Sequence, residues 1–296
     1  MTTADQKNAQ QNRNTIYVES GEIISVDEFP GNQFIMRIRA PKCAAKAEPG
    51  SFVHITCDEA LPMRRPLSIM RVEDDCFDIL YKIVGHGLRS LSTKGLGDTV
   101  SILGPIGQPF RLSEERPRAL LIGGGVGIPP MVYIADHLRR QGGDWAPLAI
   151  LGSELPFPFK LQSSNIETPW LDDEITATMP LMEDWGISCR LATLAGFDSC
   201  YDGYVTDLAD RWLSTLSSDE LAEVGIFSCG PTPMLKAVAS LAERYGVPCQ
   251  VSLEEFMACA VGGCAGCAVK ISTPDGDAMK RACVDGPVFD AATVVW

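Results

Sequence analysis

Four cysteines near the C-terminus, Cys259, Cys264, Cys267 and Cys283, have the spacing C-x4-C-x2-C-x15-C. This order of thiols is the ligand pattern of a plant-type [2Fe–2S] cluster. Glycines between and beside the first three cysteines permit backbone conformations in which N–H groups approach the sulfurs, and such hydrogen bonds tune the reduction potential of a cluster. The spacing therefore predicts an electron carrier that binds a [2Fe–2S] cluster.

Zinc is the alternative metal for the same thiols. Zinc knuckles and ribbons usually present two separate short cysteine pairs, and this sequence does not repeat the C-x2-C pair of Cys264 and Cys267. The spacing favours iron–sulfur chemistry over a structural zinc site.

Composition narrows the class of protein that carries this site. The 296 residues, 46% of them hydrophobic, are enough for two domains and a small additional module. A formal net charge of −13 argues against a general nucleic-acid binder, because phosphate neutralisation needs clustered Lys and Arg. The chain has no run of about 18 apolar residues and no N-terminal signal sequence. Its eleven cysteines lack a disulfide framework, so we expect a cytoplasmic protein in a reducing compartment, without a membrane span.

Short strands separated by Gly, Pro and Asp occupy the first third of the chain, after a polar tail at residues 1–14 that we expect to be flexible. The segments 16–26, 34–39, 52–56, 77–84 and 99–103 read as strands, and 88–94 reads as a short helix. Several short strands at this spacing predict an antiparallel β-barrel over residues 15–114.

The pattern changes at Pro117 to apolar strands that alternate with amphipathic helices. Strands are expected at 119–122, 148–151 and 224–228, and helices at 129–140 and 233–245. This alternation predicts a parallel-sheet nucleotide-binding domain over residues 115–248, followed by a small cluster module at 249–296. The expected fold class is therefore β plus α/β, with an antiparallel barrel, a parallel-sheet domain and a C-terminal [2Fe–2S] module.

A glycine turn joins the first apolar strand of this domain to its helix and contains Gly123, Gly124, Gly125 and Gly127. Such a turn lets a pyrophosphate approach backbone N–H groups at the positive end of a helix dipole, so we interpret it as an NAD site. The turn lacks the G-x-G-x-x-G order, and a tight turn that needs glycine only for its backbone conformation is the alternative. Glu154, after the strand at 148–151, is a candidate acceptor for a ribose hydroxyl, which would favour NAD over NADP.

Further motifs occur in a fixed order along the chain: Arg65-Pro66-Leu67-Ser68, Leu80-Tyr81-Lys82, Gly85-His86-Gly87-Leu88, the glycine turn, and Cys229-Gly230-Pro231. Together they resemble the ferredoxin-NADP reductase superfamily. The resemblance implies that Arg65 contacts the pyrophosphate of FAD and that Ser68 hydrogen-bonds to the flavin. It also places Cys229, with Gly230 and Pro231, near the nicotinamide and the flavin, where the cysteine would orient hydride transfer. A plain buried thiol is the alternative for Cys229.

The cluster segments MACAVGGCAGC (257–267) and CVDGPVF (283–289) narrow this resemblance. Along residues 15–290 the chain is similar to the electron-transfer subunits of dihydroorotate dehydrogenase B. That similarity implies that residues 65–68, residues 80–82 and Gly87 bind FAD. Leu88 stands where that family usually has a threonine, so only its backbone N–H would remain for the FAD phosphate.

The resemblance implies a circuit in which electrons run between NAD(H), FAD and the [2Fe–2S] cluster. A nicotinamide carries two electrons as a hydride and the cluster carries one, so a flavin must lie between them. The implied partner is an FMN-containing dihydroorotate dehydrogenase catalytic subunit, which oxidises dihydroorotate to orotate in pyrimidine biosynthesis, in a heterotetramer with two copies of each subunit. An apolar rim around residues 257–268 is the expected docking surface.

Two other functions stay open at this point. The first is the small subunit of a related ferredoxin:NADP oxidoreductase, sulfide dehydrogenase or hydrogenase complex, because these share the same layout. The second is a non-enzymatic iron–sulfur redox sensor, or a zinc module, that binds no flavin. Bound FAD distinguishes the second from the rest.

Overall fold

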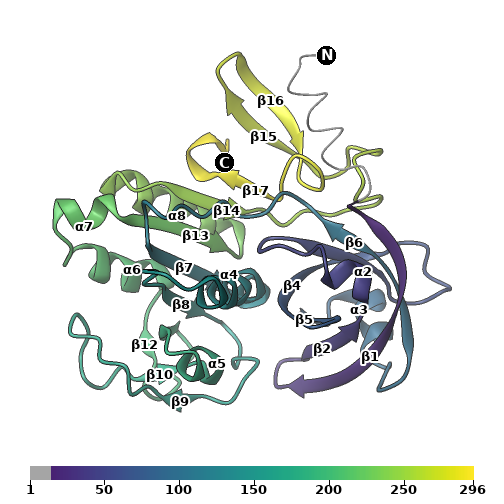
Figure 1. The fold of residues 1–296 in the computed structure, drawn as a ribbon, viewed down its shortest axis with the longest axis horizontal. Helices are drawn as coiled ribbons and strands as arrows, with labels where there is room; N and C mark the ends of the chain where they lie inside the picture. The colour runs from purple at the N-terminus through teal and green to yellow at the C-terminus, as the bar shows by residue number, and fades with distance from the viewer. Residues whose placement is uncertain (1–14) are drawn as a thin grey trace.

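The computed structural model describes residues 15–296, so the tail predicted at residues 1–14 lies outside the described residues. Figure 1 shows a β-barrel beside an α/β domain, with the C-terminal segment lying across the top of both. The three parts appear in the order that the sequence predicted.

Six antiparallel strands close the barrel in the order β1-β2-β5-β4-β3-β6. They are β1 (Tyr17–Phe29), β2 (Gln33–Arg39), β3 (Phe52–Thr56), β4 (Arg65–Glu73), β5 (Cys76–Lys82) and β6 (Thr99–Ile106), with the short helices α2 (Pro41–Ala44) and α3 (Gly85–Leu91). Alternate side chains point inward, so Val53 and Ile55 of β3 and Leu67 and Ile69 of β4 join the barrel core. The predicted antiparallel barrel is confirmed.

The α/β domain is built on a seven-stranded sheet in the order β12-β11-β8-β7-β13-β14-β17. Its strands are β7 (Arg118–Gly124), β8 (Leu148–Gly152), β11 (Ser188–Thr193), β12 (Tyr201–Asp202), β13 (Val224–Cys229), β14 (Cys249–Ser252) and β17 (Val288–Asp290). Neighbouring strands are parallel except for β14 and β17. The central strands are buried on both faces, which explains their continuous apolar sequences. The predicted parallel sheet is confirmed.

Helices cover both faces of this sheet (Figure 1). Helices α4 (Ile128–Gln141) and α5 (Pro180–Asp184) pack on one face, and α6 (Val205–Leu213) and α8 (Thr232–Tyr245) pack on the other. Helices α4 and α8 each have a proline in the first turn, where the missing N–H costs no hydrogen bond. Helix α7 (Ser218–Ala222) and the strand pair β9 (Gln162–Ser163) and β10 (Ala177–Thr178) complete the domain.

The C-terminal segment begins and ends in the seven-stranded sheet. Strand β14 pairs with β13, and β17 pairs with β14. Between them lie the four cysteines and a hairpin of β15 (Ala268–Thr273) and β16 (Gly276–Arg281), while the short helix η2 (Ala291–Thr293) follows β17. Because β14 is a strand of the α/β sheet, we propose that the cluster module begins after Ser252 and not at residue 249; the other domain limits stay predictions.

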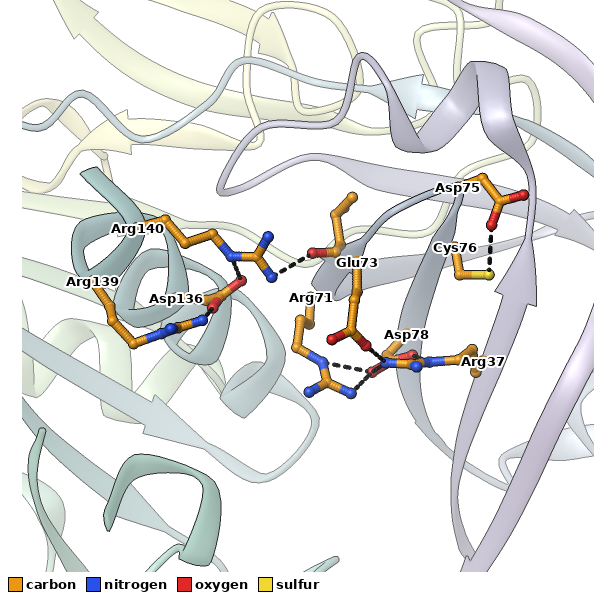
Figure 2. Close-up of polar contacts among 10 residues, drawn as sticks. Arg37, Arg71, Glu73, Asp75, Cys76, Asp78, Asp136, Arg139 and Arg140 are labelled. Carbon is orange, nitrogen blue, oxygen red and sulfur yellow. Dashed lines mark hydrogen bonds and ion pairs between the residues drawn. The ribbon is translucent and has the colours of Figure 1, made fainter. Parts of the chain in front are cut away.

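Helix α4 fixes the α/β domain against the barrel. The Nη2 of Arg140 donates to the carbonyl of Val72 in β4 at 3.0 Å, while its Nε pairs with the buried Asp136 at 2.8 Å (Figure 2). Tyr133 of the same helix donates its hydroxyl to the carbonyl of Ala47 at 2.8 Å. These contacts set the orientation of the two domains, and therefore of the surfaces that carry the predicted flavin and nucleotide sites.

A second buried carboxylate, Asp78 of β5, holds three strands of the barrel together. Arg37 of β2 and Arg71 of β4 each approach it at 2.7 Å (Figure 2). Arg37 also pairs with Glu73 at 2.8 Å. The side chain of Asp78 is only 7% exposed, so the arginines supply the counter-charges that water cannot. This network supports β4, the strand on which the predicted FAD motif lies.

Candidate functional site

Arg65, the first residue of β4, lies against the start of helix α3. Its Nη1 donates to the carbonyls of Met63 at 2.7 Å and Arg64 at 3.1 Å, which leaves its Nε and Nη2 free of these contacts. A Cβ atom on Gly87 would lie 3.0 to 3.1 Å from Nε, Cζ and Nη2 of Arg65. No side chain caps the N-terminus of α3. A guanidinium fork and uncapped backbone N–H groups therefore meet in one place, and this donor set fits a pyrophosphate such as that of FAD.

The other residues of the predicted FAD motifs divide between the two faces of the barrel wall. Ser68 lies opposite Phe52 in the β3–β4 register, and its neighbours Leu67 and Ile69 point into the barrel, so Ser68 faces outward. Leu67 and Tyr81 are buried in the barrel core, which leaves only their backbone atoms for contact with a ligand.

Leu80, Lys82 and Leu88 also differ in where their side chains lie. Leu80 packs into the core between the barrel and the α/β domain, and Lys82 lies half-buried at the end of β5. Leu88 points into the barrel core, so its side chain does not face the space beside Arg65, in agreement with a role for its N–H alone. Pro66 is half-buried on β4.

The glycine turn packs tightly against the end of β13. A Cβ on Gly127 would overlap the carbonyl of Cys229, and a Cβ on Gly124 would lie 2.6 Å from the sulfur of Met234. Gly125 has φ +55° and open space where its Cβ would be. A Cβ on Gly123 would lie 3.0 Å from Met131. Close packing therefore explains three of these glycines, whereas Gly125 presents backbone to an open surface, as a nucleotide site requires.

Cys229 ends β13 beside this turn, and its thiol is fully buried. Burial raises the pKa of Cys229 well above its ordinary value, and the charge of Glu254 adds to that rise, so the thiol stays protonated. Ser252 faces Cys229 in the register of β13 and β14. The thiol is therefore not a nucleophile; its role in orienting a nicotinamide stays a prediction.

Glu254 is a candidate ligand-binding residue that the sequence motifs did not reveal. Its side chain is exposed, yet desolvation by the surrounding chain raises its pKa above the ordinary 4.5. Glu254 follows β14 at the edge where the parallel strands end, which is where such sheets bind ligands, and that position is the signal that would have found it. Glu154 is exposed after β8 at the same edge.

The outer face of β3 packs against the cluster loop, the segment between β14 and β15 that carries Cys259, Cys264 and Cys267. Phe52 belongs to one buried cluster with Met257, Ala260, Cys267 and Cys283, while Val53 beside it points into the barrel. Ser68 lies directly opposite Phe52, so the flavin-motif strand β4 lies next to the strand whose Phe52 shares a buried cluster with two predicted cluster ligands.

His54 lies next along the outer face of β3. It is 1% exposed, and neither ring nitrogen has a hydrogen-bond partner among the described residues. Burial, with the charge of Arg64, lowers the pKa of His54 to about 4, so the ring is neutral. The nearby carbonyls of Arg64 and Met257 place this ring between the flavin motif and the cluster loop.

Cys259, Cys264 and Cys267 lie in the loop between β14 and β15, Cys283 follows β16, and the four thiols form two pairs. The backbone N–H of Cys264 donates to the sulfur of Cys259 at 3.4 Å, and the sulfurs of Cys267 and Cys283 contact each other. Burial opposes ionisation of Cys259, but N–H groups of the loop outweigh it and lower the pKa of that thiol to about 7. Burial, then the neighbouring Cys267, raises the pKa of Cys283 to about 12.

This pairing fits a two-iron cluster, with one pair of thiols for each iron. Among residues 15–296, no three His, Cys, Asp or Glu side chains converge as a ready site for a single metal ion. Ala260 and Ala265 adopt positive φ angles of 56° and 54°, an uncommon conformation that turns successive N–H groups of the loop. Three of these N–H groups point at the sulfur of Cys259, as a thiolate ligand requires.

Comparison with known proteins agrees with this geometry. The family model for the iron-sulfur cluster binding domain of dihydroorotate dehydrogenase B matches residues 254–295. The dihydroorotate dehydrogenase B (NAD(+)) electron transfer subunit of Caldanaerobacter subterraneus subsp. tengcongensis is 32% identical over 85% of this chain and 88% of that protein. The electron transfer subunit of Desulforamulus reducens is 31% identical over 94% of this chain and 98% of that protein. Among solved structures, a chain of an NADH-dependent reduced ferredoxin-NADP oxidoreductase is 28% identical, with a TM-score of 0.72 over 93% of this chain and 90% of that one.

The barrel, the parallel sheet and the thiol loop seated on β3 define an electron-transfer oxidoreductase of the ferredoxin reductase fold with an appended iron–sulfur domain. With relatives more than 30% identical over most of both chains, the chain belongs to the family of dihydroorotate dehydrogenase B electron transfer subunits. In the described part of the chain, no helix has the length and apolar character needed to cross a membrane.

Proposed function

We propose that this subunit transfers electrons between NAD(H), FAD and a [2Fe–2S] cluster, to or from an FMN-containing catalytic subunit that converts dihydroorotate to orotate in pyrimidine biosynthesis. The observation that carries the proposal is that Phe52, directly opposite Ser68 of the FAD motif, shares a buried cluster with Met257, Cys267 and Cys283. This arrangement would bring a flavin site and a cluster site to the same patch of barrel wall.

The barrel would hold FAD. Arg65 and the first N–H groups of α3 would bind its pyrophosphate, Gly87 would leave room for the Arg65 guanidinium, and Ser68 would hydrogen-bond to the flavin from the outer face of β4. Bound FAD supplies the exchange between two-electron hydride transfer and one-electron transfer.

The α/β domain would hold NAD(H). Gly125 opens the backbone of the turn to a pyrophosphate, and Glu154 would accept a ribose hydroxyl, which favours NAD over NADP. Cys229 would form the wall behind the nicotinamide, next to Gly230 and Pro231. Glu254, whose charge acts on Cys229, would orient the nicotinamide through its carboxylate.

The cluster module would hold the [2Fe–2S] cluster through Cys259, Cys264, Cys267 and Cys283. Cys264 is the exposed member of the four, and Phe256 nearby is 94% exposed, so this side is where a partner subunit would approach. We propose a heterotetramer with two copies of each subunit, in which the dihydroorotate site belongs to the partner. All eleven cysteines are free thiols, which supports a cytoplasmic, reducing location.

The experiment that tests this circuit compares Cys264→Ser with Cys200→Ser, a partly buried thiol outside the cluster loop. In rapid mixing with NADH, both variants are expected to reduce FAD at the wild-type rate. Cys264→Ser alone is expected to lose cluster reduction and transfer to the catalytic subunit. Failure of NADH to reduce the flavin in Cys264→Ser would contradict the serial order.

A further inference from the structure

Arg281, the last residue of β16, ties together two parts of the cluster loop that are distant in sequence. Its Nη1 donates to the carbonyl of Gly262 at 3.1 Å. Its Nε and Nη2 form a two-pronged ion pair with Asp285 at 3.1 and 3.3 Å, and its backbone N–H donates to the same carboxylate at 2.8 Å. Gly262 lies between the first two cluster cysteines, and Asp285 follows the fourth.

Gly262 is held on both sides by this arrangement. It has φ +79°, which favours glycine, and a Cβ there would lie 3.0 Å from Val284 and 3.2 Å from the guanidinium of Arg281. Its backbone N–H lies within reach of the sulfur of Cys283 and favours the thiolate form. Arg281 therefore holds the residue that brings the first half of the loop to the fourth cysteine.

The charge of Arg281 also acts on the predicted ligands. The guanidinium interacts electrostatically with Cys283 and with Cys267. Reduction of a cluster adds one electron and breaks no bond, so a nearby cation stabilises the reduced form more than the oxidised form. Asp285 neutralises part of this charge, but it also fixes the direction in which the guanidinium points.

We propose that Arg281 is a positioning residue for the [2Fe–2S] cluster: it clasps residues 259–264 against Cys283 through Gly262 and Asp285, and its charge raises the reduction potential of the cluster. The inference rests on the proposed function, since it requires that the four thiols hold a cluster. It assigns separate roles to the geometry of the guanidinium and to its charge.

Three variants of the purified, cluster-loaded protein separate these roles. Arg281→Gln removes the charge and most of the clasp, whereas Arg281→Lys keeps the charge but loses the two-pronged contact. Lys270→Gln is the matched control, because Lys270 lies in the same module and its ammonium pairs with Asp277 at 2.7 Å within the hairpin. It removes an equal charge from the same module.

The readouts are amide hydrogen exchange of residues 259–264 and the midpoint potential of the cluster, followed by EPR. We expect exchange about tenfold faster in both Arg281 variants and unchanged in Lys270→Gln. We expect the one-electron equilibrium of the cluster to shift about tenfold toward the oxidised form in Arg281→Gln, which is a potential lower by about 59 mV, and to stay near wild type in Arg281→Lys and Lys270→Gln.

Equal potentials and equal exchange in Arg281→Gln and Lys270→Gln would overturn the inference. A lower potential that appears equally in Arg281→Lys would overturn the role of the charge, and unchanged exchange in both Arg281 variants would overturn the clasp. Failure of the proposed function gives a different result: the wild-type protein itself would contain no cluster, with no two irons and no EPR signal on reduction.

Discussion

Replacement of Arg65 by Gln is expected to weaken FAD binding while leaving the barrel folded. Arg65 is half-buried at the start of β4, and two carbonyl contacts of its Nη1 hold the fork in place before any ligand arrives. A hydrogen bond to a charged group contributes about 1.5–3 kcal/mol. Loss of that contribution raises the dissociation constant for FAD by about 10- to 150-fold.

Gly87→Ala tests the same contact from the other side. The new Cβ would lie 3.0 to 3.1 Å from the Arg65 guanidinium, which is the mobile end of a side chain, so the guanidinium moves and the fold survives. Displacement of the fork forfeits part of the charged hydrogen bond, about 1–2 kcal/mol, or about 5- to 30-fold in affinity. Gly95→Ala is the control, because a Cβ at Gly95 meets open space and its φ is not in the left-handed region.

The assay is titration of flavin-free protein with FAD, followed by flavin fluorescence and repeated at two salt concentrations. Binding by Arg65→Gln is expected to be less sensitive to salt than binding by the wild type, because one charged contact is gone. FAD affinity in Arg65→Gln within twofold of wild type, or in Gly87→Ala equal to that in Gly95→Ala, would refute the assignment of Arg65 to the pyrophosphate.

Three further predictions concern stability and pH. Asp78→Asn leaves two arginines without their shared buried carboxylate and is expected to lower the free energy of unfolding by about 3 kcal/mol in denaturant titrations, whereas Asp277→Asn, in an exposed pair, is expected to cost less than about 1 kcal/mol. Equal losses of unfolding free energy in the two variants would contradict the claim that burial makes the Asp78 ion pairs stronger. Gly127→Ala would push a Cβ into the backbone of the β13 end and is expected to cost about 1–3 kcal/mol, read as a lower denaturant midpoint; an unchanged midpoint would show that the turn can relax. The pKa of Glu254 is raised, so just above pH 4.5 this carboxyl binds more protons in the folded chain than in the unfolded chain, and its contribution to stability falls as pH rises. Glu254→Gln is expected to remove this contribution and so change the pH slope of the free energy of unfolding across that window; an identical pH slope in both proteins would exclude the desolvated carboxylate.

Local patterns in the sequence predicted the elements that carry the sites. The apolar runs of β7, β8 and β13 and the proline-opened helices α4 and α8 follow directly from periodicity and helix-start rules. The cysteine spacing predicted a cluster domain that the family model for residues 254–295 supports. These features are local, so neighbouring residues determine them.

Features that depend on distant pairing were not predicted. Strand β11 was missed because Arg190 interrupts its apolar pattern; that arginine is buried, and its Nη1 and Nη2 donate to carbonyls, including that of Ile166 at 2.6 Å from Nη2. The membership of β17 in the large sheet follows from its pairing with β14, almost 40 residues earlier in the chain. The buried cluster that contains Phe52 and Cys283 and the hydrogen bond from Arg281 to Gly262 likewise join segments that are distant in sequence and meet only in the folded chain.

The most direct test of the electron-transfer circuit is the visible absorption spectrum of anaerobically purified protein, with FAD and iron quantified, before and after stoichiometric NADH. We expect one FAD and two irons per chain, with flavin bands and the broad cluster absorption both bleached by NADH. A colourless protein that contains zinc, or a bound flavin that bleaches while an intact cluster stays oxidised, would contradict the account.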